Sequence, residues 1–176
     1  MSTPRPPPIP TADYDLWRVY VPAWSWRPLS GEGASRFGGR WNPVGLPAIY
    51  AALELTTAWS EYNQGLTQHP GLVAHLRLTG AQLADARDAA LQDRFDIPAD
   101  LGGDGWRAAC LRDGVAPTQA AALRLRAARF DGVRYPSAMS PGGNCVALWR
   151  WNVRGGPGLA VEDPEGRLKI GLANQV

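Results

Sequence analysis

Hydrophobic and polar residues alternate in several stretches of the chain, as they do in strands that bury one face. Residues 16–21 and 72–79 alternate clearly, and residues 144–151 are almost continuously apolar or aromatic. Such runs, rich in β-branched and aromatic side chains, are typical of strands. Two shorter apolar segments, 48–52 and 133–135, have the composition of buried strands. The pattern therefore predicts five short strands, separated by other segments of the chain.

A different period appears between residues 53 and 65, where apolar side chains recur every three to four positions. This spacing predicts an amphipathic helix, and Gly65 is a suitable residue to end it. Glu61 lies at the edge of the apolar face, where a side chain points either into a cleft or into solvent. The residues that form the apolar face are Leu55, Ala58, Trp59, Tyr62 and Leu66.

Three further segments favour helix. Residues 81–90 and 117–128 are rich in alanine, and Pro117 is well placed in a first helical turn. Residues 106–112 are long enough for one or two turns, and a short last strand is expected near residues 168–172. No internal repeat and no domain boundary is visible. We expect residues 1–13 to be a flexible proline-rich arm and residues 14–176 to form one domain.

The longest segment without a helix or strand pattern is 22–47, which holds three tryptophans and a cluster of glycines and arginines. Segments of this length in a compact domain are usually functional or disordered, and the tryptophans argue against disorder. The N–H groups of Gly38 and Gly39 can meet an anion, and the Arg40 guanidinium can bind its oxygens in pairs. An ordinary glycine-rich turn would have the same composition, so both interpretations stay open.

Composition excludes several classes of function. The net charge of +2 is too small for binding nucleic acid by bulk electrostatics, and nearly all of the eighteen cationic residues are arginine, which favours recognition of carboxylate or phosphate. Two cysteines, Cys110 and Cys145, and two histidines make a metal site improbable. Buried free thiols in a reducing compartment are expected. No apolar run is long enough to span a membrane, so a cytoplasmic protein is predicted.

Two polar residues, one on a predicted strand and one just after a strand, have two interpretations each. Arg18 lies on a predicted strand and is either a rim residue of the sheet or part of a site. Ser137 follows the strand 133–135, before a glycine-rich bend, and either presents its hydroxyl to a ligand or stabilises the turn. No G-x-S-x-G sequence surrounds any serine and no suitable histidine accompanies one, which argues against a serine hydrolase.

The stretch from Gly31 to Tyr50 reads G-x-G-A-x-x-x-G-G-R-W-N-x-x-G-x-x-x-x-Y and resembles the RES domain family, named for an Arg, a Glu and a Ser. Arg40 corresponds to the family arginine, Glu61 to the glutamate of an A-x-x-E helix, and Ser137 to the serine of a P-S loop. The resemblance extends over about residues 16–151 and includes Asn144 and the Trp106-Arg107 element.

The resemblance implies a fold, a substrate and a partner. The fold is α+β, similar to ADP-ribosyltransferases, with split antiparallel sheets, surrounding helices and a cleft for NAD. The family consists of toxins of bacterial toxin–antitoxin pairs that degrade NAD by hydrolysis or phosphorolysis. Their partner is an Xre-type antitoxin that blocks the cleft and binds operator DNA, so that the toxin meets DNA only indirectly. NAD is a substrate here, and no cofactor, metal or membrane is implied.

Physical roles can be assigned to the matching residues. Glu61 can hold the ribose and stabilise developing positive charge, Arg40 can bind the pyrophosphate or an attacking phosphate, and Ser137 can orient the ribose or the amide. Tyr50 can stack on nicotinamide. The further candidates for contact with NAD are Arg18, Gly39, Trp41, Asn42 and Asn144.

Three functions remain open on the sequence alone. The first is a toxin that breaks the nicotinamide–ribose bond of NAD. The second is an ADP-ribosyltransferase that modifies a cellular protein. The third is a binding module without catalysis, in which the segment around Arg40 is a docking surface.

Overall fold

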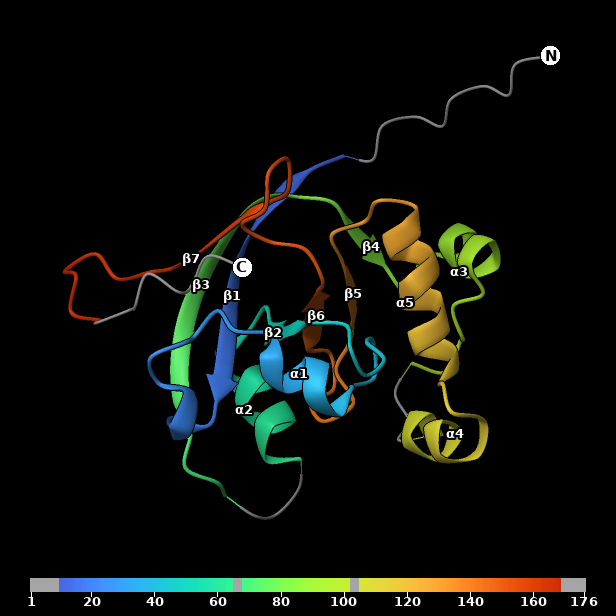
Figure 1. Ribbon diagram of the computed structural model, residues 1–176, viewed down its shortest axis with the longest axis horizontal. Helices are drawn as coiled ribbons and strands as arrows, with labels where there is room; N and C mark the ends of the chain where they lie inside the picture. Colours follow the sequence, from blue (N-terminus) through green and yellow to red (C-terminus); the bar gives the residue numbers. More distant parts are fainter. Residues whose placement is uncertain (1–9, 65–67, 102–104, 169–176) are drawn as a thin grey trace.

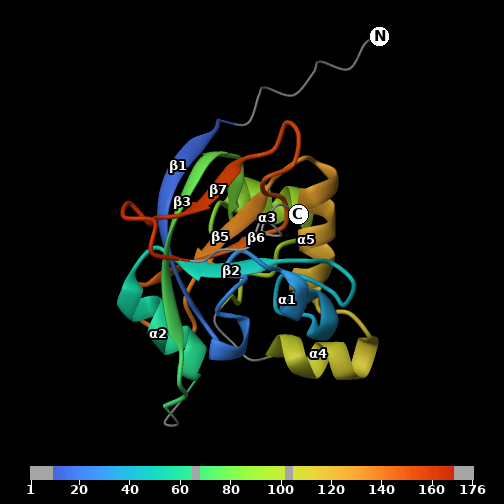
Figure 2. The same cartoon turned by 60° about the vertical axis from the view of Figure 1, so that its left-hand side comes forward.

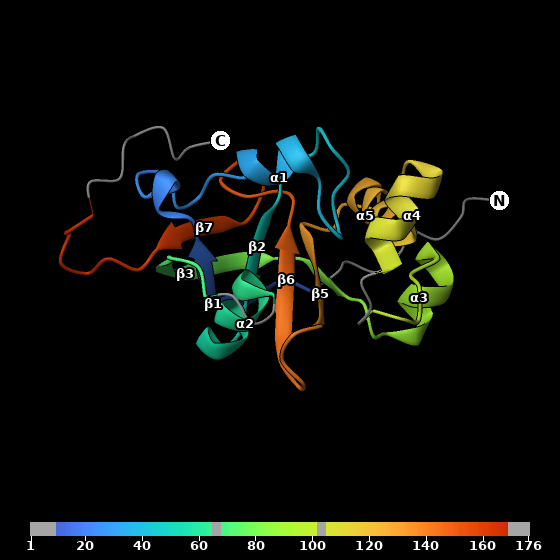
Figure 3. The same cartoon turned by 90° about the horizontal axis from the view of Figure 1, so that it is seen from below.

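The computed structural model describes residues 10–64, 68–101 and 105–168. Seven strands form one mixed sheet in the order β4-β5-β6-β2-β1-β3-β7, most of which can be followed across Figure 3. All pairings are antiparallel except β4 with β5, which is parallel. The strands are β1 (Ala12–Tyr20), β2 (Ile49–Ala52), β3 (Leu72–Ala81), β4 (Leu83–Asp85), β5 (Gly132–Pro136), β6 (Asn144–Leu148) and β7 (Gly158–Val161).

The sheet divides between β1 and β2. These two strands are joined by a single residue pair, Trp17 with Ala52, whereas β1 and β3 are paired along most of their length. In Figure 2, β2 accordingly lies across the direction of β1 and β3. The α+β class expected from the sequence is therefore confirmed. In place of the expected split antiparallel sheets, the strands form one mixed sheet with a short contact between β1 and β2 and one parallel pair.

The described residues form five α-helices, which lie around this sheet (Figure 1). Helix α2 packs against β1, β2 and β6, and α5 packs against β5 with α3 and α4 beside it. The helices are α1 (Glu32–Phe37), α2 (Leu55–Asn63), α3 (Ala89–Phe95), α4 (Gly105–Asp113) and α5 (Pro117–Ala127), and a 3-10 turn, η1, spans Pro22–Trp24.

Alternating residues of the central strands supply two hydrophobic clusters. Ile49 and Val146 belong to the cluster that also contains Leu29 and Trp151. Ala52 and Ala147, on the opposite face, belong to the cluster shared with α2, α3 and α5. Since successive side chains of a strand point to opposite faces, one face of β1, β2, β5 and β6 is turned toward the helices and is available for a site.

The predicted strands 16–21, 48–52, 72–79, 133–135 and 144–151 and the helices 53–65, 106–112 and 117–128 are all present, with shifted ends. The helix expected over 81–90 was wrong. This segment ends β3, forms β4 beside β5, and enters α3 only at Ala89, where Asp88 accepts hydrogen bonds from the N–H groups of Ala90 and Leu91. Tertiary strand pairing overrides the helix propensity of the alanines.

Other differences lie in the loops and at the ends of the chain. The segment 22–47 contains the helix α1, which its glycine content did not indicate, and β7 was not expected in the glycine-rich tail. Residues 1–9 of the predicted arm lie outside the described residues, while β1 begins at Ala12, inside the range assigned to the arm. Most of the strand expected near 168–172 and the predicted helix end at Gly65 also lie outside the described residues.

The described ranges hold neither a membrane-spanning helix nor a cluster of metal-binding side chains. No helix there is long and apolar enough to cross a bilayer. No group of three or more histidine, cysteine or acidic side chains suited to a metal ion occurs in the same ranges. Neither described cysteine forms a disulfide; Cys145 is buried as expected, whereas Cys110 is only partly buried.

Candidate active site

The glycine-rich motif folds as helix α1 followed by a tight turn. Gly38 ends α1 with φ near 70°, a backbone conformation that glycine adopts easily. Gly39 and Asn42 then face each other, with Gly39 N donating to Asn42 O over 2.9 Å. Arg40 and Trp41 form the tip of this turn, so their side chains leave it in fixed directions.

A buried hydrogen-bond network holds the turn from behind. The fully buried Asn42 side chain donates from Nδ2 to Ala34 O and Leu46 O, and its Oδ1 accepts a hydrogen bond from the Tyr50 hydroxyl at 2.7 Å. The same hydroxyl accepts from Trp41 N at 2.9 Å. Tyr50 and Asn42 therefore fix the motif to β2, and burial keeps the pKa of the Tyr50 phenol above its usual value.

The first turn of α5 holds the motif from another side. Thr118 Oγ1 donates to Arg40 O at 2.6 Å, and Gln119 Nε2 donates to Gly39 O at 2.8 Å and to Asn42 O. Gln119 is buried, and its Oε1 accepts from Ala116 N. Three carbonyl groups of the motif thus have partners supplied by a helix about 80 positions later in the sequence.

Two guanidinium groups are fixed near the motif by backbone carbonyls. Arg40 Nη1 donates to Leu101 O at 2.6 Å. Arg18 donates to Pro28 O at 2.7 Å and to Ser30 O at 3.0 Å, and burial lowers its pKa to about 10, which leaves it charged at neutral pH. Both guanidinium groups also line one cavity, and guanidinium groups can bind the oxygens of an anion in pairs.

The carboxylate of Glu61 meets the loop after β5. Its Oε1 accepts hydrogen bonds from Ser137 Oγ at 2.5 Å and from Ala138 N at 2.9 Å. The Ser137 hydroxyl oxygen in turn accepts from the N–H groups of Met139 and Ser140. Among the described residues, no hydrogen bond reaches Glu61 Oε2. One oxygen is therefore held in place, and the other is available to a ligand.

Two neighbouring cavities meet at Glu61. The larger, the arginine cavity, has a volume of about 450 Å³ and includes Arg18, Arg40, Arg107, Phe37 and Trp106 in its lining. The smaller, the aromatic cavity, has a volume of about 270 Å³ and includes Trp17, Tyr62, Ala52, Ala58 and Cys145. Both cavities are also lined by Val19, Tyr50, Glu61, Gln64 and Tyr135.

Two buried residues at this junction were not identified as site residues from the sequence. Tyr135 lies on β5, two positions before Ser137, and Cys145 faces it on β6. Burial raises the pKa of Tyr135, and it raises the pKa of the Cys145 thiol to about 12, with Glu61 nearby as a second cause. Both groups are therefore neutral at physiological pH. The position of Tyr135 on the strand face that leads to Ser137 could have indicated it.

Comparisons with known proteins show the family and the fold of the chain. A family model described as the RES domain matches residues 15–170, which is most of the chain. The chain belongs to the RES domain family. Its fold is similar to the crystal structure of the M. tuberculosis MbcT–MbcA toxin–antitoxin complex, with a TM-score of 0.62 and 22% identity over 79% of this chain and 75% of that one. No curated protein matches the chain.

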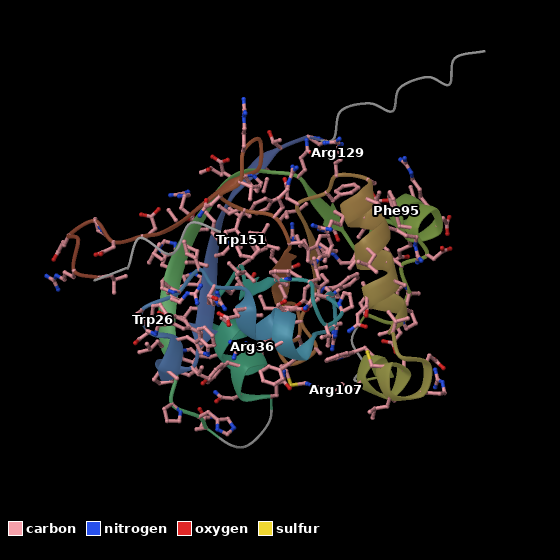
Figure 4. All side chains as sticks on the ribbon, in the orientation of Figure 1. Trp26, Arg36, Phe95, Arg107, Arg129 and Trp151 are labelled. Atoms are coloured by element: carbon pink, nitrogen blue, oxygen red, sulfur yellow. The ribbon has the colours of Figure 1, made fainter. Side chains whose placement is uncertain are left out.

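Within this RES domain, the predicted residues Arg18, Gly39, Arg40, Tyr50 and Glu61 all line the arginine cavity. Ser137 is brought to the same place by its hydrogen bond to Glu61. The Trp106-Arg107 element also reaches the cavity. Figure 4 shows Arg107 on the side of α4 that faces α1 and α2, and its Nη2 donates to Gln64 Oε1.

Three other candidates lie outside the cavity linings of the RES domain. Trp41 and Asn42 are fully buried behind the motif, and Asn144 opens β6 with its Oδ1 accepting from the Arg134 guanidinium. Their side chains support the cavity walls, so a direct contact with NAD is not supported for them. The sequence pattern could not separate these supporting residues from lining residues, because both belong to the same motif.

Proposed function

We propose that this RES domain is the toxin of a toxin–antitoxin pair and that it consumes NAD by breaking the bond between nicotinamide and ribose. The family and the similarity to a toxin–antitoxin complex support the biological role. The cavity supports the chemistry, because it combines guanidinium groups for a pyrophosphate with one carboxylate for a sugar.

The position of Glu61 carries this proposal. Cleavage of an N-glycosidic bond passes through a state in which positive charge develops on the ribose. A carboxylate with one oxygen fixed by Ser137 and Ala138 is ready to stabilise that charge without reorganising. Its second oxygen can accept a hydrogen bond from a ribose hydroxyl.

The proposed reaction breaks one bond of NAD and forms one new bond, with no oxidation or reduction. The bond between the ribose carbon and the pyridinium nitrogen breaks, and its electron pair leaves with nicotinamide, which becomes neutral. An oxygen atom of water or of phosphate forms the new bond to the ribose carbon. In hydrolysis the attacking water releases one proton to the solvent, and in phosphorolysis a phosphate dianion attacks and no proton has to be released. Because the leaving group departs neutral, no strong general acid is needed.

An antitoxin would control this activity by covering the cavity. We propose an Xre-type partner, so that contact with operator DNA takes place through the antitoxin alone. Expression of the chain without its partner should deplete cellular NAD and stop growth, and the Glu61→Gln variant should do neither. Growth arrest by Glu61→Gln at equal protein level would separate toxicity from the chemistry proposed here.

The direct test incubates the purified chain with NAD, with and without phosphate, and identifies the products. Nicotinamide should be released by the native chain, and Glu61→Gln should reduce the rate at least a hundredfold, because electrostatic groups of this kind contribute about 2.7–4 kcal/mol. Glu54→Gln is the matched control. Glu54 precedes the same helix, but its Oε2 accepts from Asn144 N away from both cavities, so its rate should not change.

The products decide between the remaining functions. Equal amounts of free ADP-ribose with and without phosphate would exclude phosphorolysis and indicate hydrolysis. Labelled NAD that leaves most of its label on a protein would indicate ADP-ribosyl transfer. Folded protein without antitoxin that leaves NAD intact would refute catalysis and favour a binding module.

A further inference from the structure

The two cavities that meet at Glu61 differ in charge. Among the described residues, three arginines line the arginine cavity, whereas Glu61 is the one charged residue in the lining of the aromatic cavity. The remaining lining of the aromatic cavity is made of aromatic rings, small apolar side chains, Gln64 and a thiol. Phosphate groups will occupy the first cavity, and a flat uncharged ring is suited to the second.

The order of groups in NAD links these preferences. The pyrophosphate, the ribose and the nicotinamide ring follow one another along the molecule. If the proposed function is correct, the phosphates meet Arg18 and Arg40, and the ribose lies at Glu61. The next group along the molecule then enters the aromatic cavity. We infer that this cavity binds the nicotinamide ring and that Trp17 is the surface on which the ring stacks.

The indole of Trp17 is held rigidly for this role. Trp17 on β1 and His75 on β3 are directly paired, and their rings stack with centroids 4.4 Å apart and an interplanar angle of 14°. His75 Nε2 is in turn 3.2 Å from Asp15 Oδ1. A ring that is already fixed loses little conformational freedom when a ligand binds, and this favours affinity.

The neighbouring residues leave room beside this indole. Ala52 and Ala58 contribute small side chains to the lining, from β2 and α2. Tyr62 also lines the cavity, and its hydroxyl donates to Pro70 O at 2.7 Å, which fixes its ring. Cys145 completes the lining with a neutral thiol. The cavity therefore selects a flat ring by shape and stacking.

The test measures the two product fragments separately on the folded chain. Nicotinamide and ADP-ribose are each titrated by calorimetry, and each is also used as an inhibitor of NAD cleavage. Trp17→Leu should weaken nicotinamide binding about tenfold or more, the scale of one base–aromatic stacking contact, and leave the affinity for ADP-ribose within about twofold. Trp17→Phe keeps a stacking ring and should retain most of the nicotinamide affinity.

Trp26→Leu is the matched control, because Trp26 is a half-exposed tryptophan that lines neither cavity. It should leave nicotinamide binding unchanged. Circular dichroism shows whether each variant is folded. If Trp17→Leu is not, Trp17→Met, which keeps more side-chain volume but has no ring, takes its place and should weaken nicotinamide binding in the same way. A folded Trp17→Leu chain that binds nicotinamide as well as the native chain would overturn the inference.

The outcomes separate this inference from the proposed function. NAD cleavage with nicotinamide inhibition that does not depend on Trp17 would refute the placement of the ring and leave the function intact. Nicotinamide binding that depends on Trp17, without any NAD cleavage by the native chain, would refute the function and support the aromatic cavity as a site for a pyridine ring.

Discussion

Gly39 is the residue of the motif whose replacement has the most direct physical consequence. A Cβ atom at this position would lie 2.5 Å from the Tyr50 hydroxyl oxygen and 2.8 Å from Asn42 Oδ1. Both distances are too short for carbon and oxygen, so Gly39→Ala must displace the Tyr50 hydroxyl. The displaced group is the one that joins Asn42 to Trp41 N.

The magnitude follows from these two hydrogen bonds. Each contributes about 0.5–1.5 kcal/mol net, and a buried donor left without a partner costs about 1–3 kcal/mol. Trp41 is fully buried, so its N–H is such a donor. We expect Gly39→Ala to lower the free energy of unfolding by about 2–4 kcal/mol. A single domain of typical stability stays folded after a loss of this size.

Urea unfolding followed by tryptophan fluorescence measures this loss, with the slope m expected to be unchanged. Gly33→Ala is the control. Gly33 lies in α1, and a Cβ there meets no atom within 4 Å, so this variant should be neutral or up to about 1 kcal/mol more stable. Tyr50→Phe removes the same two hydrogen bonds and leaves the same buried N–H without a partner, so it should also cost about 2–4 kcal/mol.

The double variant tests the mechanism. Once the hydroxyl is absent, the phenyl ring is no longer held by Asn42 and Trp41 and can withdraw from the new Cβ. The combined loss should therefore be smaller than the sum of the single losses by about 1–2 kcal/mol. Additive losses, or a Gly39→Ala chain as stable as the native one, would show that the contact with Tyr50 is not the reason for glycine at this position.

The remaining predictions concern three other groups. Ser137→Ala should lower kcat/KM for NAD about tenfold or more, because it removes a hydrogen bond to the Glu61 carboxylate. The rate of nicotinamide release at low NAD concentration measures kcat/KM. An unchanged value would exclude Ser137 from the chemistry. Asp131→Ala should lower the free energy of unfolding by about 2–4 kcal/mol, because it leaves the Arg150 guanidinium without its buried partner. The loss should be somewhat smaller than for a fully buried ion pair, since Arg150 is partly exposed. A loss below about 0.5 kcal/mol in urea unfolding would contradict this. Burial raises the pKa of Cys145 from about 9 to about 12, so the folded chain keeps a proton that the unfolded chain loses, and this residue's contribution to stability should fall as the pH rises through that range. Cys145→Ala should flatten this part of the pH profile of unfolding, and identical profiles would contradict the assignment.

Local sequence predicted those parts of the fold that depend on local pattern. The strict alternation of residues 72–79 places Leu76 and Leu78 in one buried cluster, as β3 does in the structure. The period of residues 53–65 predicts α2 in the same way. In both cases burial of one face is decided by side chains that are close in sequence.

The same reasoning failed where a distant strand decides the conformation. Alanine-rich residues 81–90 favour helix locally, yet Leu83 pairs with Gly132 and the N–H of Gln82 donates to the buried Asp131 carboxylate. Helix α1 was missed for the opposite reason. It contains Gly33, a poor helix former, and has glycines at both caps, and hydrogen bonds from residues outside the helix support it, such as the one from Asn42 Nδ2 to Ala34 O.

The family motif, most strands and helices, and the residue types of the site can be read from the sequence. Which of these site residues come into contact depends on the tertiary structure. Glu61 and Ser137 are 76 positions apart and come together because β5 and β6 bring the loop after β5 beside α2. It also decided that Arg40 lines a cavity while Trp41, the next residue, is buried behind it. Side chains are sorted into lining and support by packing between elements that are distant in the sequence, and a local pattern of residues does not contain that information.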